Sequence, residues 1–270
     1  MSKESIEKIQ RKLELITQKW WFFLIFILVQ FIIPPYASKG YEWAEMGTVT
    51  GEILSHAIVF DYPALYPIFK IVPIMLFISI GFFRNRVTRL FSIYAAITYV
   101  LFAFLQSIAV TKKYGLGIVT INLIMFLVVA AFWFWEAVAK KNDFTPQKRP
   151  LWKYWVVPLA FLAFWYPVNP DTLMPDFNPI YLLTNVAGLT FCMMTPAYLA
   201  ILTLYYPKVN IATLRVTSLV GTIIGFYNMM TNFLIDPGKL WWNGVLHIPL
   251  VVISIYALVL SLKSKKSEPI

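Results

Sequence analysis

The feature that most constrains this chain is a series of long apolar runs, separated by short breaks that carry charges, glycine or proline. A helix that crosses a bilayer needs about 20 predominantly apolar residues. The chain is 59% hydrophobic and 13% charged, whereas soluble domains carry about 25% charged residues. The eight runs long enough to cross with some tilt are 20–33, 66–83, 90–110, 116–138, 151–168, 180–206, 211–235 and 245–262. We therefore expect an all-α, polytopic integral membrane bundle of about eight transmembrane helices.

The distribution of Lys and Arg over the loops predicts the orientation of these helices. If the N-terminus is cytoplasmic, 18 of the 23 basic residues lie inside, and the two faces carry net charges of +12 and −2. Membrane proteins keep an excess of Lys and Arg on the cytoplasmic side. An even number of spans also leaves the basic tail, Lys263–Lys266, inside. We expect both termini in the cytoplasm, and the net charge of +10 then reports orientation and predicts no nucleic-acid partner.

The chain divides into a short cytoplasmic segment and one transmembrane domain. Residues 1–19 place apolar side chains at helical spacing, which predicts an amphipathic helix leading into the first span. Residues 20–266 form a single helical domain. Lys followed by aromatic residues opens both the first and the fifth spans, which suggests a weak four-plus-four repeat over 20–138 and 151–262.

The first outer loop, residues 34–65, contains a short helix for which two placements are open. The moderately apolar stretch 49–60 is too short to cross a bilayer. It is expected either to lie on the surface or to enter the membrane as a re-entrant half-helix packed among the spans.

Intramembrane charge is a usual indicator of function, because a charged group in the bilayer core is costly. Lys70, Glu136 and Arg215 lie about one turn from the predicted span ends, so we expect their side chains to reach the interface. Neither a series of acids for a proton relay nor an Arg series for voltage sensing is present in the sequence.

The remaining polar groups gather toward the outer side. Asn228, Asn232 and Asp236 recur every four residues along the seventh span, and Trp242 follows at the start of the eighth. A polar stripe on a membrane helix faces protein or water. We expect these four residues to line a ligand-binding site.

Both histidines fall in the same outer region. Glu52 and His56 are four residues apart, Asp61 follows, and His247 lies near the start of the last span. Such side chains can bind Zn²⁺, Fe²⁺ or Mn²⁺, or can act as general acid and base. No strong zinc spacing such as H-E-x-x-H is present, so these four residues form a weaker candidate site for a divalent metal.

Other motifs bear mainly on architecture. Gly221 and Gly225 form a G-x-x-x-G pair that permits close helix packing. Cys192 is the only cysteine, and no nucleotide-binding or serine-hydrolase motif is present in the sequence.

Three classes of function remain open. The favoured one is a small-molecule or ion transporter, or a membrane-embedded binding component, with an outward-facing cavity. The first alternative is an enzyme, with or without a metal, that acts on a lipid-like substrate at the outer leaflet. The second is a non-catalytic subunit that packs against membrane partners. The plasma membrane is the default location.

Overall fold

The computed structural model describes residues 2–263, so the basic tail predicted beyond Lys263 lies outside the described residues. The structure is 76% helical with almost no sheet. The α-helices are α1 (Lys3–Thr17), α2 (Trp20–Ile32), α3 (Met46–Ser55), α4 (Tyr66–Phe83), α5 (Thr88–Leu101), α6 (Thr120–Ala139), α7 (Val156–Trp165), α8 (Tyr181–Thr184), α9 (Phe191–Tyr205), α10 (Ile211–Met230) and α11 (Pro237–Lys263).

Short 3-10 and π turns extend several of these helices. The 3-10 turns are η1 (Trp43–Glu45), η2 (Ile58–Asp61), η3 (Pro63–Leu65), η4 (Arg84–Arg86), η6 (Leu151–Trp155) and η7 (Val186–Leu189). The π turns are η5 (Phe102–Gln106), which continues α5, and η8 (Thr231–Ile235), which continues α10.

Between five and seven helices are long and apolar enough to cross a membrane. Five are continuous, and two more are pairs bent at a short break, namely α1 with α2 (65°) and Tyr181–Leu189 with α9 (93°). The segment Leu151–Trp165 is a shorter apolar helix. The predicted all-α fold, with several apolar helices that could span a membrane, is therefore confirmed, whereas the count of eight spans stays a prediction.

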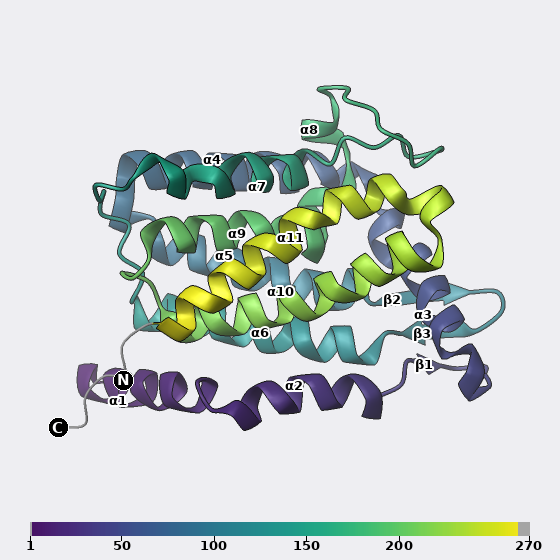
Figure 1. The fold of residues 1–270 in the computed structure, drawn as a ribbon, viewed down its shortest axis with the longest axis horizontal. Coiled ribbons are helices and arrows are strands. Elements are labelled where there is room, and N and C mark those ends of the chain that lie inside the picture. The colour runs from purple at the N-terminus through teal and green to yellow at the C-terminus, as the bar shows by residue number, and fades with distance from the viewer. Residues whose placement is uncertain (1, 264–270) are drawn as a thin grey trace.

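The helices run lengthwise side by side, and the connections gather at two ends (Figure 1). One end holds the start of α1, the end of α11 and the turns after α4, α6 and α9. The opposite end, which we call the distal end, holds the strands, α3 and α8. Helices α1 and α2 lie along one edge of the bundle.

The distal end carries a small antiparallel sheet that the sequence prediction did not include. Its strands β1 (Tyr36–Ala37), β2 (Ile108–Thr111) and β3 (Gly115–Ile118) pair in the order β1-β3-β2. The predicted spans 90–110 and 116–138 thus include a hairpin at their junction. A short apolar run does not by itself distinguish strand from helix, and Gly115, at φ 68°, supplies the positive φ that the turn requires.

Helix α3 covers this sheet. Val49 and Ile53 are fully buried against Ala109 and Tyr114. A Cβ at Gly117 of β3 would lie 2.5 Å from the Ile53 side chain, so the helix packs directly on the strand. The stretch 49–60 is therefore a helix seated on the sheet at the distal end, followed by the turn η2.

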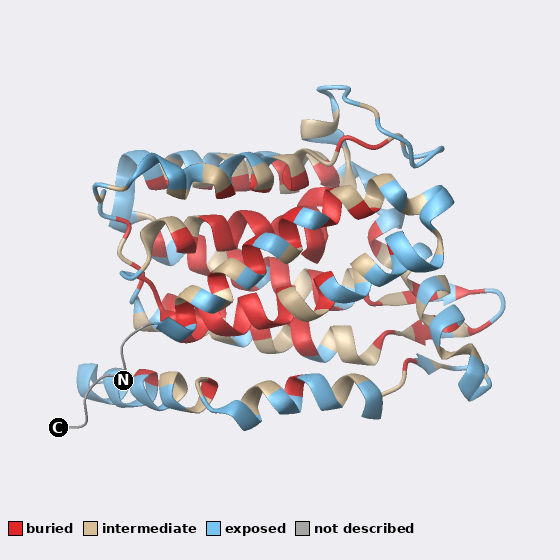
Figure 2. Ribbon diagram, viewed as in Figure 1, coloured by how far each residue is buried: buried red, intermediate tan, exposed pale blue. Residues whose placement is uncertain are grey.

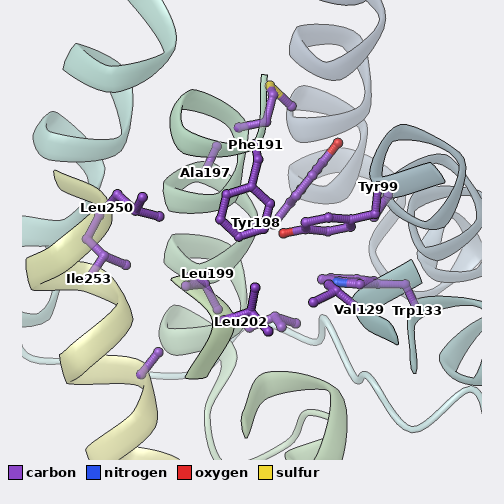
Figure 3. Close-up of a cluster of buried hydrophobic side chains, with 14 of the residues drawn as sticks. Tyr99, Val129, Trp133, Phe191, Ala197, Tyr198, Leu199, Leu202, Leu250 and Ile253 are labelled. Atoms are coloured by element: carbon purple, nitrogen blue, oxygen red, sulfur yellow. The ribbon is translucent and has the colours of Figure 1, made fainter. Parts of the chain in front are cut away.

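Buried residues fill the centre of the bundle (Figure 2), and aromatic rings pack against one another there (Figure 3). The Tyr198 ring on α9 lies 5.7 Å from that of Tyr99 and 5.8 Å from that of Trp133. Their polar atoms are paired: Tyr99 Oη lies 3.0 Å from Thr195 Oγ1, and Trp133 Nε1 donates to Thr217 Oγ1 at 3.1 Å. This packing joins α5, α6, α9 and α10 into one core.

Helices α10 and α11 form an antiparallel seam along the bundle. A Cβ at Gly221 would lie 2.3 Å from Ser254 Oγ, and one at Gly225 would lie 2.8 Å from Val251 Cγ2. The G-x-x-x-G pair therefore faces α11 and lets the two helices approach closely. Near the turn between η8 and α11, Asn243 Nδ2 donates to Asn232 Oδ1 at 2.8 Å. This pair fits the same antiparallel register as Gly221 with Ser254 and Gly225 with Val251.

Candidate functional site

The prediction that Lys70, Glu136 and Arg215 reach the interface is wrong, because all three side chains are buried. Their exposed fractions are 0%, 0% and 2%. Each lies near a helix end in sequence, but neighbouring elements cover that end. These three residues are buried charges held by hydrogen bonds inside the protein.

Glu136 lies in a buried polar cluster at the end of the bundle that holds α1. Its Oε1 accepts from the Asn142 backbone N–H at 2.8 Å, and its Oε2 accepts from Asn210 Nδ2 at 2.7 Å. Asn210 and Gln10 exchange two hydrogen bonds of 2.9 and 3.1 Å. Within residues 2–263, Glu136 forms no ion pair. The cluster therefore joins α1, α6 and α10 through neutral amides.

Arg215 attaches α1 to the end of α11. One guanidinium nitrogen donates to Thr17 Oγ1 at 2.8 Å and to the Glu14 carbonyl at 3.1 Å, and the other donates to the Ser261 carbonyl at 2.7 Å. Carbonyls at helix ends lack intrahelical donors, so a cation there is favourable. The predicted amphipathic helix is thus anchored to the bundle through its buried polar face.

Lys70 caps the C-terminus of α7 near the distal end, as Arg215 caps the C-terminal carbonyls of α1 and α11. Its ammonium donates to the carbonyl of Phe164 and lies 4.3 Å from the centre of the Phe164 ring. Asn185 Nδ2 donates to the next two carbonyls, Trp165 at 2.7 Å and Tyr166 at 3.0 Å. Lys70 and Asn185 together satisfy the carbonyls at the C-terminus of α7.

Asp143 organises the loop between α6 and α7. Hydrogen bonds from Thr145 and Asn85, with Lys208 nearby, lower the pKa of its carboxyl to about 2 from its ordinary 3.8. A lowered pKa means that the carboxylate stabilises the folded loop above about pH 4, and that this contribution is lost as the pH falls through about 2.

We expect hydrogen exchange to reveal this titration. In the wild type, amide protection in the loop 140–150 should fall between about pH 4 and pH 2, because protonation weakens the hydrogen bonds that Asp143 accepts. Asp143→Asn should abolish the pH-dependent step while keeping the size of the side chain. An unchanged step in the variant would show that another group causes it.

The candidate ligand site is a chain of polar side chains near the distal end, where α7, α9, α10 and α11 meet. We call it the amide chain, and its members are Tyr166, Cys192, Asn228, Asn232 and Asn243, with His247. Tyr166 Oη donates to Asn243 Oδ1 at 2.9 Å. Asn243 donates in turn to Asn232 Oδ1, as described above. The amide chain then reaches Asn228, whose backbone carbonyl accepts a hydrogen bond from Asn232 Nδ2 at 2.7 Å.

The direction of these hydrogen bonds is determined by two backbone carbonyls. A carbonyl oxygen only accepts, so Asn232 must turn its Nδ2 toward the Asn228 carbonyl and its Oδ1 toward Asn243. Asn228 must likewise direct its Nδ2 at the Ile224 carbonyl, 2.9 Å away, and this nitrogen also lies 3.6 Å from Cys192 Sγ. The orientation of every amide in the chain follows from this.

Two helix irregularities lie beside the amide chain. Asn232 is in the π turn η8, and π turns occur frequently at functional sites. Cys192 is in the first turn of α9, directly after the 93° bend that divides the predicted span 180–206. Gln106, in the π turn η5, accepts from the Phe191 N–H at 2.9 Å. The start of α9 is therefore contacted by Gln106 of the π turn η5 and by Asn228, which lies in α10 just before the π turn η8.

The structure brings together only part of the predicted ligand set. Asn228 and Asn232 are joined, but Asp236 lies beyond the π turn, which adds a residue to the helical register and ends the four-residue stripe. In the described structure the Asp236 carboxylate has no hydrogen bond or ion pair. Trp242 donates to the Pro167 carbonyl at 2.7 Å, so it anchors the loop after α7.

The predicted metal set is not assembled. Glu52 and His56 lie 3.7 Å apart on an exposed part of α3, while His247 is buried on α11 with an exposed fraction of 6%. Asp61 is exposed at the end of η2. No group of three or more His, Cys, Asp or Glu side chains that could hold a metal ion occurs among residues 2–263.

The sequence-based prediction missed three members of the amide chain, Tyr166, Cys192 and Asn243, and placed a fourth, His247, elsewhere. Tyr166 and Asn243 carried no periodic signal, and His247 was grouped with the metal candidates. Asn243 is 11 residues from Asn232, across a helical turn, and Tyr166 comes from a different helix. Only the α10–α11 register could have indicated the pairing, and that register is a tertiary property.

Comparisons with protein-family models, curated proteins and solved structures found no match. The class of this protein therefore rests on its own fold and chemistry. It is a helical protein whose apolar helices are suited to a membrane, with a partly buried polar chain near one end.

Proposed function

We propose that this protein is a small-molecule carrier, or a membrane-embedded binding component, whose ligand site is the amide chain. The observation that carries the proposal is the partly buried run of hydrogen-bonded side chains from Tyr166 to Asn228, with the fully buried Asn232 at its centre. Polar side chains inside a membrane bundle are costly unless they are paired or serve a ligand. Here they meet at a broken helix and a π turn, which is the kind of place where transporters bind substrates.

The orientation supports an outward-facing site. In the proposed topology, the five long helices, the two bent pairs and the shorter segment Leu151–Trp165 provide eight crossings. Both termini are then cytoplasmic, together with the basic turns after α4, α6 and α9. The amide chain lies toward the opposite, distal end, which faces outward if the protein resides in the plasma membrane.

Loss of binding in Asn232→Leu tests this proposal. We expect a thermal-shift screen of small molecules on the detergent-purified protein to yield stabilising compounds, since a ligand at 100 times its Kd adds about 2.7 kcal/mol to stability. Asn232→Leu should abolish the shift, because it removes both hydrogen bonds at the centre of the chain. Uptake of the same compounds into proteoliposomes then separates a carrier from a binding component.

Gln30→Leu is the matched control. Gln30 is an amide in α2 whose Nε2 donates to the Phe26 carbonyl and lies near Met125 Sδ, away from the amide chain. This variant should keep the thermal shift. Equal shifts in Asn232→Leu and Gln30→Leu would contradict a ligand site at the amide chain.

A further inference from the structure

The two polar side-chain atoms of the amide chain that lack any partner in the described structure are both hydrogen-bond acceptors. Asn228 Nδ2 is directed at the Ile224 carbonyl, which leaves Asn228 Oδ1 without a donor. His247 Nδ1 lies 2.7 Å from the Asn243 carbonyl. Because that carbonyl only accepts, Nδ1 carries the proton of the neutral ring, and Nε2 is left as a bare acceptor with no partner.

The helix register places these two residues opposite each other. Across the antiparallel seam, Asn232 pairs with Asn243, Gly225 lies against Val251 and Gly221 lies against Ser254. Asn228 is one turn before Asn232, and His247 is one turn after Asn243. Both therefore lie one turn from the amide pair in the same direction, and the same register sets position 228 opposite position 247.

Neither Asn228 Oδ1 nor His247 Nε2 is fully enclosed by the protein, so both acceptors are accessible to a ligand. A ligand that binds both acceptors must present two donors, and each such hydrogen bond contributes about 0.5–1.5 kcal/mol. The amide chain contains no acidic or basic side chain apart from neutral His247, so a cation would have no counter-charge there. A small uncharged group with two N–H or O–H hydrogens fits this requirement.

We propose, on the basis of the proposed function, that the ligand is an uncharged molecule bearing a primary amide or a pair of hydroxyls. Its two donors bridge Asn228 Oδ1 and His247 Nε2. The ordered amides of the chain hold both acceptors in place. This assignment names the ligand class of the site and makes His247 its second anchor.

Nitrogen NMR of the full-length protein in detergent, labelled with ¹⁵N-histidine, tests the proposal directly. The chain has two histidines, and His56→Phe assigns the signal of the exposed one. We expect Nε2 of His247 to give the signal of an unprotonated ring nitrogen. Acetamide and propane-1,2-diol should move it, whereas N,N-dimethylacetamide and 1,2-dimethoxypropane, which lack donors, should not.

Asn228→Leu provides the second measurement. It removes one acceptor at similar side-chain size and should weaken acetamide binding about tenfold, which corresponds to the loss of one hydrogen bond. Gln30→Leu should bind acetamide like the wild type. If Asn228→Leu does not fold, the wild-type protonation state of Nε2 and the four probes still decide the question.

The other outcomes separate this inference from the proposed function. A protonated Nε2, or equal responses to acetamide and its dimethyl analogue, would overturn the donor assignment. A third outcome is that none of the four probes moves the signal, while the thermal shift produced by screening compounds still depends on Asn232. In that case only water binds Asn228 Oδ1 and His247 Nε2. The proposed ligand class is then wrong, but the amide chain remains the ligand site. If screening compounds do not depend on Asn232, the site itself fails.

Discussion

Replacing Arg215 by Met is expected to destabilise the protein by about 2–4 kcal/mol and to release α1 from the bundle. The guanidinium makes three hydrogen bonds, to Thr17 Oγ1 and to the carbonyls of Glu14 and Ser261. Each is worth about 0.6–1.5 kcal/mol inside a membrane protein, and the substitution leaves the buried Ser261 carbonyl without its guanidinium donor, whereas the Glu14 carbonyl keeps the donor Thr17 Oγ1. Thermal unfolding and hydrogen exchange of residues 3–17 measure the two effects.

Arg86→Met is the control for this prediction, because Arg86 is exposed in the turn after α4. It should leave both the unfolding temperature and the exchange of α1 unchanged. Arg215→Lys should be intermediate, since an ammonium donates hydrogen bonds but lacks the planar fork that reaches two helices at once. Unchanged protection of α1 in Arg215→Met would show that the apolar face and the hydrogen bonds of Gln10 hold this helix without Arg215.

Gly188→Ala is the second large effect that we expect. A Cβ at Gly188 would lie 2.2 Å from the carbonyl oxygen of Phe69 and 3.2 Å from the amide nitrogen of Lys70. Both atoms belong to the backbone of α4, so no side-chain rotation relieves the clash. The cost should be at the upper end of the roughly 1–3 kcal/mol that overpacking produces.

The same substitution should disturb the end of α7. Moving α4 away from Gly188 displaces Lys70, whose ammonium caps the Phe164 carbonyl. We expect a lower unfolding temperature together with faster amide exchange near residues 164–168. Gly51→Ala in α3 is the matched control: no atom lies within 4 Å of its Cβ position, and alanine favours the helix, so this variant should be neutral or slightly stabilised.

The membrane class was predictable from the sequence because it depends on a local property. A run such as Ile211–Ile235 must hide its backbone polar groups from lipid, and its own helical hydrogen bonds do so wherever the run is placed. The glycines at 221 and 225 likewise indicated a close approach of two helices. Both inferences need only the order of residues along one segment.

Local rules were insufficient where segments from different parts of the chain meet. Ile108–Thr111 is apolar like the helix before it, and only pairing with Gly115–Ile118 makes it a strand. Lys70, Glu136 and Arg215 lie near helix ends, where a membrane protein ordinarily lets charges reach water. Whether another element covers that end is decided by packing.

The sequence by itself therefore determined that the helices of this protein are apolar enough for a membrane, their approximate limits and the polar stripe that begins at Asn228. The tertiary structure decided which polar atoms meet. Asn243, Tyr166 and His247 join the amide chain because the α10–α11 register and the turn after α7 bring them there. Hydrogen bonds between side chains act over about 3 Å, and positions along the chain do not specify distances of that size until the helices are packed.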